Sequence, residues 1–243
     1  MSHQEVVGLV LRAVEYKESD LILTVLTEGG ILTLSARGVR RKNAPLAAAA
    51  EVLCCSRMTL SKYQGRYSLK EADIIESFYP LREDLKRMAL ASYLADLGQM
   101  VAPEGDFLPL IFRALRVICK KERPLPLVKG TFELRILWES GVLPKAETCQ
   151  SCNAFSSEFF LHPGFGTALC PSCTKDVPKE KLLFCKQDTL LALRHIQTSP
   201  EEKLFSFALG EEAQKDFSAF SEKCVLAHIE KPPSSLEYYL RIK

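Results

Sequence analysis

The residues best suited to chemistry are four cysteines arranged as two Cys-x-x-Cys pairs. Cys149 and Cys152 form the first pair, Cys170 and Cys173 form the second, and residues 153–169 lie between them. A Cys-x-x-Cys turn brings two thiolates to one metal ion, and two such turns fill the tetrahedral shell that zinc prefers. Because four thiolates leave no position for water, we expect one structural Zn²⁺ and no chemistry at the metal.

Other interpretations of the cysteines are weaker. Four unconnected buried cysteines are the main alternative, and a redox role would leave one of the two pairs without a function. His162 is a further candidate ligand, which four thiolates make unnecessary. The remaining cysteines have no partner at ligand spacing, and we expect them to fill apolar core positions: Cys54, Cys55, Cys119, Cys185 and Cys224.

A basic segment is the second informative feature. Residues 1–30 carry two basic and five acidic side chains, whereas residues 31–70 carry eight basic side chains and one acidic, a local net charge of +7. Tyr63 and Tyr67 lie among these cations and offer faces on which bases can stack. The pattern predicts a groove for single-stranded nucleic acid, and a solvated face that protects strand edges is the alternative. Lys70 shares strand parity with Arg66, whereas Arg57 and Lys62 need not lie on that face.

The elements that must position this segment are short strands. Apolar, β-branched-rich runs occupy residues 6–14, 21–26, 31–36, 52–60 and 66–75. Gly29 and Gly30 lie between the second and third runs, where glycine can supply a positive φ and so favours a hairpin. Five short strands predict a small antiparallel barrel, because closure removes exposed strand edges.

After residue 80 the apolar period changes to three and four, which predicts helices. We expect helices over residues 81–101, 107–118, 131–140, 187–197, 200–209 and 211–229, and a last short one after Pro232 and Pro233. The helix over 131–140 is apolar on most sides and should be buried, with Gly141 as its C-terminal stop.

Composition excludes several classes of protein. Hydrophobic residues make up 47% and charged residues 26% of the 243 residues, which is ordinary for a globular chain. No run of eighteen apolar residues and no signal peptide is present, so we expect a soluble, cytoplasmic protein without membrane contact. The sequence has no nucleophile elbow, no phosphate-binding loop and no His-Glu-x-x-His motif, so we expect no enzyme.

Four stretches, in this order, resemble the RecO family of recombination mediators. The family's N-terminal barrel is similar to GLVLRAVEYKESDLILTVLTEGG followed by ARGVRR, and its junction into a helical domain is similar to IIESFYPLREDLKRMALASYLADL. Its central helix and zinc region resemble TFELRILWESGVLP followed by CQSC and CPSC, and the end of its last helix resembles YYLRIK. The likeness spans nearly the whole chain.

The resemblance implies an α+β, multi-domain fold. Its barrel would be a five-stranded oligonucleotide/oligosaccharide-binding (OB) fold at residues 1–79. A helical domain would occupy residues 80–145 and 186–243, with a zinc-binding module inserted at residues 146–185. Some family members lack the cysteines, so the metal is not expected to be essential to the shared activity.

The resemblance also implies a role in DNA repair and recombination. Such a protein binds single-stranded and double-stranded DNA and anneals complementary single strands. With RecR it helps load RecA onto strands covered by single-stranded DNA-binding protein, at the nucleoid and without hydrolysing nucleotide. By motif position Arg37, Arg40 and Arg41 would contact DNA; the charge argument alone adds Lys42, Arg57, Lys62 and Arg66.

Two other functions stay open at this point. The chain can be a zinc-ribbon scaffold that holds protein complexes together, with its basic loop against acidic protein surfaces. It can also be a nucleic-acid enzyme whose catalytic residues assemble from distant positions, because the absence of a motif is weak evidence against catalysis.

Overall fold

A computed structural model describes residues 2–102, 107–162, 166–175 and 177–242. The chain forms two compact units: residues 1–85 with 102–112, and residues 86–101 with 113–243.

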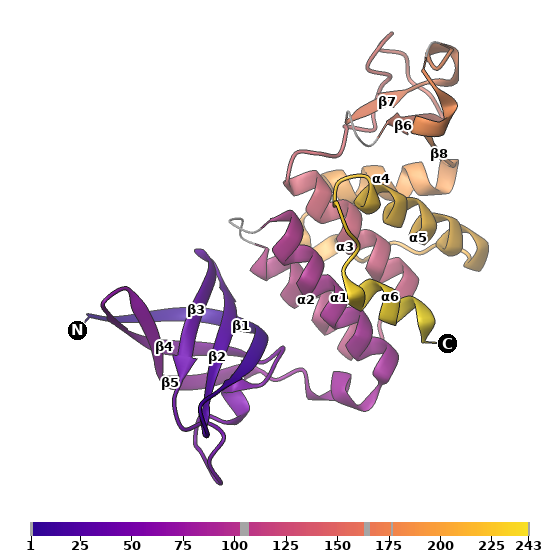
Figure 1. The fold of residues 1–243 in the computed structure, drawn as a ribbon. Coiled ribbons are helices and arrows are strands. Elements are labelled where there is room, and N and C mark those ends of the chain that lie inside the picture. The colour runs from indigo at the N-terminus through magenta and orange to yellow at the C-terminus, as the bar shows by residue number, and fades with distance from the viewer. Residues whose placement is uncertain (1, 103–106, 163–165, 176, 243) are drawn as a thin grey trace. The chain divides into compact units, whose positions relative to one another are not determined.

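A closed barrel of five strands forms the first unit (Figure 1). The strands are β1 (Ser2–Tyr16), β2 (Asp20–Thr27), β3 (Gly30–Ala36), β4 (Cys55–Tyr63) and β5 (Arg66–Glu76). They follow the order β1-β2-β3-β5-β4, and β4 pairs with β1 to close the ring. This is the strand order of an OB barrel, so the predicted fold class is confirmed.

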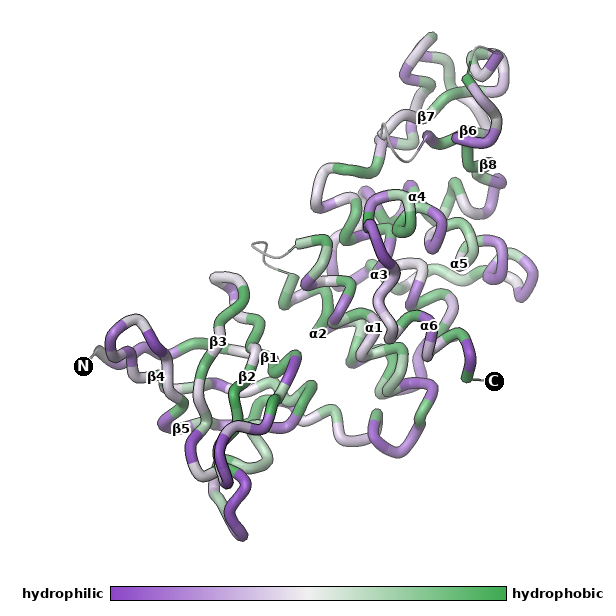
Figure 2. Tube along the Cα trace, viewed as in Figure 1, coloured by the Kyte–Doolittle hydropathy of each residue, from purple (hydrophilic) through white to green (hydrophobic). Residues whose placement is uncertain are grey.

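Alternating residues of the strands fill the barrel. Its core consists of fully or nearly fully buried side chains: Val10, Leu23, Val25, Leu34, Ala36, Val39, Ala50, Met58, Leu60 and Leu69. Figure 2 shows hydrophobic stretches along the strands and hydrophilic residues in the loops between them. The predicted β2–β3 hairpin is confirmed, with Gly30 at a φ of 95°. A short 3₁₀ helix, η1 (Ala48–Ala50), lies between β3 and β4 and adds buried Ala49 and Ala50.

The parallel pair β3 and β5 is the shortest seam of the barrel. Only Leu34 with Tyr67 and Ser35 with Ser68 are in register there. The hydroxyl oxygens of Ser35 and Ser68 lie 2.9 Å apart and add a side-chain hydrogen bond to the ladder. Arg66 of β5 lies directly before this seam, and Arg37 directly follows β3.

Helices build the second unit. They are α1 (Leu85–Val101), α2 (Leu108–Cys119), α3 (Leu125–Glu139), α4 (Gln187–Thr198), α5 (Glu211–Leu226) and α6 (Ser234–Arg241), and the unit division falls within α2. The 3₁₀ helix η2 (Tyr79–Glu83) precedes α1. Helix α3 packs against α4 and α5 and is buried over most of its length, as predicted. Gly141, at a φ of 73°, donates its N–H to the carbonyl of Trp138 and ends the helix as expected.

Helix α3 begins earlier than its apolar period predicts. It starts at Leu125, with Pro124 as its N-cap and Pro126 in the first turn, where a missing N–H removes no helical hydrogen bond. Gly130 lies where α5 approaches, since a Cβ there would stand 2.5 Å from the Phe217 ring. The glycine that interrupts the sequence pattern therefore permits close packing.

The predicted helix over residues 200–209 is wrong. Only η6 (Glu201–Lys203) is helical there, and the chain is then irregular as far as α5. Arg123 explains the break, because its Nε donates to the Phe205 carbonyl at 2.7 Å and its Nη2 to the Ser206 carbonyl at 3.3 Å. Those carbonyls bind a guanidinium in place of helical N–H groups.

A charged network lies inside the helical unit. The Lys129 ammonium lies 2.9 Å from a carboxylate oxygen of Glu133 and 2.9 Å from one of Glu222. The Tyr93 hydroxyl donates to Glu133 at 2.5 Å, and the Ser221 hydroxyl donates to its other oxygen at 2.6 Å. Burial raises the pKa of Glu133, and Lys129 opposes that rise. The cluster links α1, α3 and α5.

A small antiparallel sheet carries the cysteine region in the order β7-β6-β8. Its strands are β6 (Phe159–His162), β7 (Thr167–Leu169) and β8 (Leu183–Cys185). Within the described ranges of the chain, no helix is long and apolar enough to span a membrane.

Candidate metal centre and nucleic-acid interface

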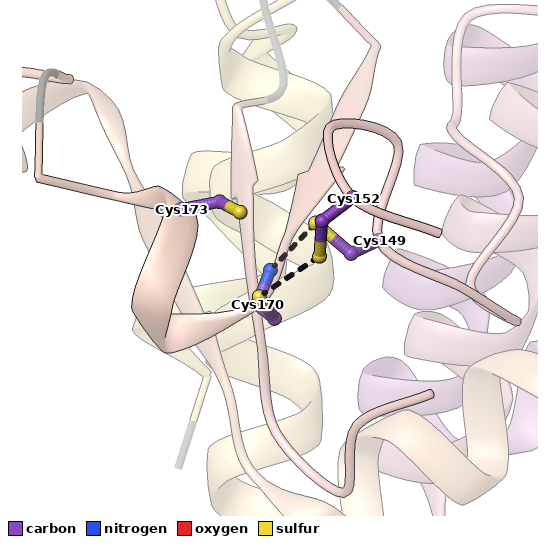
Figure 3. A group of neighbouring side chains, drawn as sticks. All are labelled: Cys149, Cys152, Cys170 and Cys173. Atoms are coloured by element: carbon purple, nitrogen blue, oxygen red, sulfur yellow. Dashed lines mark hydrogen bonds between the residues drawn. The ribbon is translucent and has the colours of Figure 1, made fainter. Parts of the chain in front are cut away.

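The four predicted cysteines converge on one point. Cys149 and Cys152 belong to a turn, whereas Cys170 is the N-cap and Cys173 the last residue of the 3₁₀ helix η4 (Pro171–Cys173), directly after β7 (Figure 3). Their Sγ atoms all lie within 4.8 Å of one another. His162 is not a member of this cluster. The group can therefore hold a metal ion with sulfur ligands alone.

Backbone hydrogen bonds hold both turns in shape. The Asn153 N–H donates to the Cys149 carbonyl at 2.8 Å, and the Cys173 N–H donates to the Cys170 carbonyl at 2.9 Å. The Gln150 N–H donates to the Ala168 carbonyl at 3.0 Å and so fastens the first turn to β7. The two turns lie close together because Cys170 and Cys173 directly follow β7, which is hydrogen-bonded to the first turn.

The spacing of the sulfurs fits a tetrahedral thiolate site. Zinc–sulfur bonds of about 2.3 Å place neighbouring sulfurs of a tetrahedron about 3.8 Å apart. The Sγ atoms of Cys152 and Cys170 are 3.7 Å apart, much more than the length of a disulfide bond. The donor set suits a soft or borderline cation such as zinc, which binds thiolates readily.

Local hydrogen bonds also favour thiolate at the centre. Burial raises the pKa of Cys149, but N–H groups of Cys170, Cys152 and Ser151 outweigh it and lower that pKa to about 6. The Cys170 N–H, for example, donates to the Cys149 sulfur at 3.3 Å. One ligand is thus prepared for a cation at neutral pH.

The five remaining cysteines behave differently. Cys54, Cys55, Cys185 and Cys224 are buried, and Cys119 is half-buried. Burial raises the pKa of Cys55 to about 11 and that of Cys185 to about 12. These two remain neutral thiols at physiological pH. Burial of four of the five cysteines fits the core role expected for them, whereas Cys119 is only partly buried.

A groove of about 720 Å³ lies on the outer face of the barrel. It extends from the β1–β2 turn to the β4–β5 turn, and outward side chains of β2 and β3, including Ile22, Thr33 and Ser35, line it. Three tyrosines add aromatic surface at its edges: Tyr16, Tyr63 and Tyr67. Tyr16 is 49% and Tyr63 61% exposed, so both rings are accessible to a ligand.

Cations collect at the same groove. Lys17, Arg37 and Arg66 line it. An adjoining hollow of about 390 Å³ is lined by Lys17 and Arg37 again, together with Arg41. In the described parts of the chain, Arg37 and Arg41 form no ion pair, so their guanidinium groups face solvent.

The other predicted basic residues are placed differently. Arg40 pairs with Glu15 at 2.9 Å. The Lys62 ammonium lies 5.1 Å from the centroid of the Tyr67 ring and covers one of its faces. Lys42 is exposed on the loop beyond Arg41.

Arg57 lines a separate hollow of about 590 Å³, together with Glu5 and Glu28. Lys70 is exposed at a register shift between β4 and β5 and is not among the residues that line the groove with Arg66. The structure therefore brings together Arg37, Arg41 and Arg66 and leaves Arg57 apart.

Sequence reasoning missed Lys17 and Tyr16. Both come from the predominantly acidic first thirty residues, where charge counting gives no hint of a basic site. The polar break YKESD between two apolar runs marks a hairpin turn, and that turn was the available signal.

Comparison with protein families matches both parts of the chain. Residues 1–78 match the family described as "Recombination protein O N terminal", and residues 82–237 match "Recombination protein O C terminal". The first match covers the barrel strands, and the second covers α1 to α5, the start of α6 and the cysteine cluster.

Individual proteins are similar over nearly their full length. The DNA repair protein RecO of Acetivibrio thermocellus is 30% identical over 98% of this chain and 96% of its own length. That of Anaeromyxobacter dehalogenans is 31% identical over 91% of each chain, and that of Clostridium perfringens is 26% identical over 97% of each.

Proposed function

This chain belongs to the RecO family of DNA repair proteins, and we propose that it is a DNA-binding recombination mediator that catalyses no reaction. The observation that carries the proposal is the groove on the barrel face, with cations and tyrosines side by side. In OB folds the face of strands 2 and 3, between the loops that follow strands 1 and 4, is where oligonucleotides bind. The groove occupies that face.

The chemistry of the groove suits single-stranded DNA. Lys17, Arg37 and Arg41 can neutralise successive phosphates, while Tyr16 and Tyr63 can stack on bases without regard to sequence. Lys42 and Lys62 lie beyond the groove rim as secondary contacts, and Arg57 faces carboxylates and should contribute least. Binding without base readout is what annealing of arbitrary complementary strands requires.

A salt titration tests this function. Affinity for labelled single-stranded DNA should fall steeply with salt, because each neutralised phosphate adds about 0.7 to the slope of log affinity against log salt. Arg37→Gln with Arg41→Gln should lower that slope by about 1.4. Arg57→Gln is the matched control and should change it little.

Salt-independent binding, or an unchanged slope in the double variant, would contradict the proposal. Binding to duplex DNA and annealing of complementary strands are measured with the same variants, and repeated with RecR and single-stranded DNA-binding protein. We propose both proteins as partners, with RecA loading as the outcome and the nucleoid of the bacterial cytoplasm as the place. Loss of annealing should parallel loss of binding.

We further infer that the four-cysteine cluster holds one structural Zn²⁺. Four thiolates complete the shell, so the ion would polarise no substrate. Its role would be to join the two turns and β7 into one module. Metal analysis of protein purified under reducing conditions should find one zinc per chain, and a metal-free preparation that remains folded would contradict the inference.

A further inference from the structure

Arg40 belongs to the basic loop of residues 37–43 but differs from its neighbours in its contacts. Its guanidinium donates to the Glu15 carboxylate at 2.9 Å and to the Glu18 carbonyl at 3.4 Å. Its backbone N–H donates to the Ser19 carbonyl at 3.0 Å. Two of the five guanidinium N–H groups of Arg40 thus contact the end of β1 and the β1–β2 turn, and a phosphate would compete with the Glu15 carboxylate for this cation.

A second contact fastens the same two loops. The Gly38 N–H donates to the Asp20 carboxylate at 2.8 Å. The Arg41 side chain lies directly over Gly38, within 3.6–3.8 Å of where a Cβ would stand. The Arg41 N–H donates to the Gly38 carbonyl at 3.1 Å, and the Ala44 N–H to the Arg41 carbonyl at 3.1 Å. The loop is a series of tight turns that begins at this contact.

These contacts decide where the free cations point. Arg37 and Arg41 lie on either side of the Asp20–Gly38 contact, and both line the hollow that contains Lys17. Three cations and the single carboxylate of Asp20 line this hollow, so a net repulsion remains, and holding the cations together requires fixed contacts behind them. The contacts that Arg40 makes with Glu15 and the β1–β2 turn, and the contact of Gly38 with Asp20, supply this.

We propose that Arg40 is a positioning residue, which holds loop 37–43 against the β1–β2 turn so that Arg37 and Arg41 face DNA, and does not itself bind phosphate. The proposal rests on the DNA binding proposed above and refines it. For one substitution, the removal of the Glu15 charge, the proposal predicts an effect on DNA binding opposite in sign to the one expected from charge repulsion. Glu15 is 72% exposed and repels DNA, so simple electrostatics predicts that removing its charge strengthens binding.

Glu15→Gln is the decisive variant, and Glu18→Gln is its matched control. Glu18 is an exposed acid three residues away whose carboxylate forms no ion pair within the described part of the chain. We expect Glu15→Gln to weaken binding of a labelled oligothymidylate about two- to fivefold, the range that an exposed ion pair supports. Glu18→Gln should bind as tightly as the original protein or more tightly.

The pair also gives a double-mutant cycle. If Arg40 acts through Glu15, Arg40→Gln combined with Glu15→Gln should bind no more weakly than Arg40→Gln alone. Tighter binding by Glu15→Gln, together with additive effects in the double variant, would overturn the proposal and make Arg40 a phosphate contact.

Amide hydrogen exchange of the DNA-free protein separates this proposal from the proposed function. Exchange across residues 38–44 should accelerate in Glu15→Gln and Arg40→Gln and stay unchanged in Glu18→Gln. Unchanged exchange in all three variants would overturn the positioning role. If the Arg37 and Arg41 variants bind DNA normally, the proposed function fails, while the exchange result still decides whether Arg40 holds the loop.

Discussion

At the scale of single residues, the buried Lys129 ammonium shows how context sets the role of a charge. The side chain is 1% exposed and that of Glu133 is fully buried, whereas the arginines of the barrel loop face solvent. Buried charges persist only where each has a partner, because desolvation outweighs an incomplete set of contacts. The Lys129 network is therefore structural, whereas Arg37 and Arg41 of the loop remain available to a ligand.

Lys129→Met should lower the free energy of unfolding by about 3–5 kcal/mol, because it leaves Glu133 buried without its cation. Without the opposing charge of Lys129, burial raises the pKa of Glu133 further above its unfolded value. A carboxyl group with a raised folded pKa stabilises at low pH and loses that contribution as pH rises, so the loss should be larger at about pH 8 than at about pH 5. Urea unfolding at both pH values measures it.

Glu237→Gln is the control for this prediction. Its partner Arg241 is 80% exposed and 3.6 Å away, and the unfolding free energy should change by no more than about 0.5 kcal/mol. Equal losses of unfolding free energy in the two variants would contradict the prediction, because the buried charge would then contribute no more than an exposed one.

At the scale of elements, the close packing of α3 and α5 depends on one missing side chain. The apolar period of α3 predicts a buried helix, but period alone does not say which residue a neighbour approaches. Gly130 meets Phe217 and Ser221, all within the helical unit. A residue with poor helix propensity is thus placed where two helix backbones come together.

Gly130→Ala should therefore destabilise the protein, although alanine favours helix. The new Cβ would stand 2.5 and 2.8 Å from two ring carbons of buried Phe217, and overpacking of this kind costs about 1–3 kcal/mol. Thermal unfolding measures the change, with Gly29→Ala as a control because its nearest atom lies 3.9 Å away. A Gly130→Ala protein that is more stable than the original would contradict this prediction and would mean that α5 shifts at little cost to make room for the new Cβ.

The elements themselves were largely predictable. Five strands and six of the seven expected helices are confirmed, because each has an apolar period and a turn or proline at its ends. The segment over residues 200–209 failed because Arg123, more than seventy residues earlier, binds its carbonyls. The apolar period of a segment gives no information about a contact with a residue so far away in the chain.

At the scale of the whole molecule, the two proposed sites, for DNA and for zinc, belong to different units. The groove residues belong to residues 1–85, and the cysteine cluster belongs to the other unit. Loss of the metal should therefore unfold structure near the cysteines without removing the DNA-binding face.

Cys149→Ser tests this separation. It removes one of four ligands, and because metal binding in such sites is worth on the order of 10 kcal/mol, zinc content and amide protection around residues 146–185 should fall sharply. Affinity for single-stranded DNA should stay within about twofold, since no groove residue is changed. Cys119→Ser, outside the cluster, should keep both zinc and protection. A parallel loss of DNA binding in Cys149→Ser would show that the units depend on each other.

The sequence by itself determined which four cysteines cluster and the type of each main element, because both depend on spacing along a few neighbouring residues. Two Cys-x-x-Cys turns specify their sulfurs locally, and an apolar period specifies a strand or a helix. Only the tertiary structure decided which cations share a groove. The pairing of β3 with β2, which places Ala36 opposite Leu21, and the contacts of the following loop with Ser19 and Asp20 bring Arg37, Arg41 and Lys17 together. Arg57 lines another hollow with Glu5 and Glu28. Such placement depends on contacts between separate segments of the chain. Counting charges along one segment does not reveal these contacts.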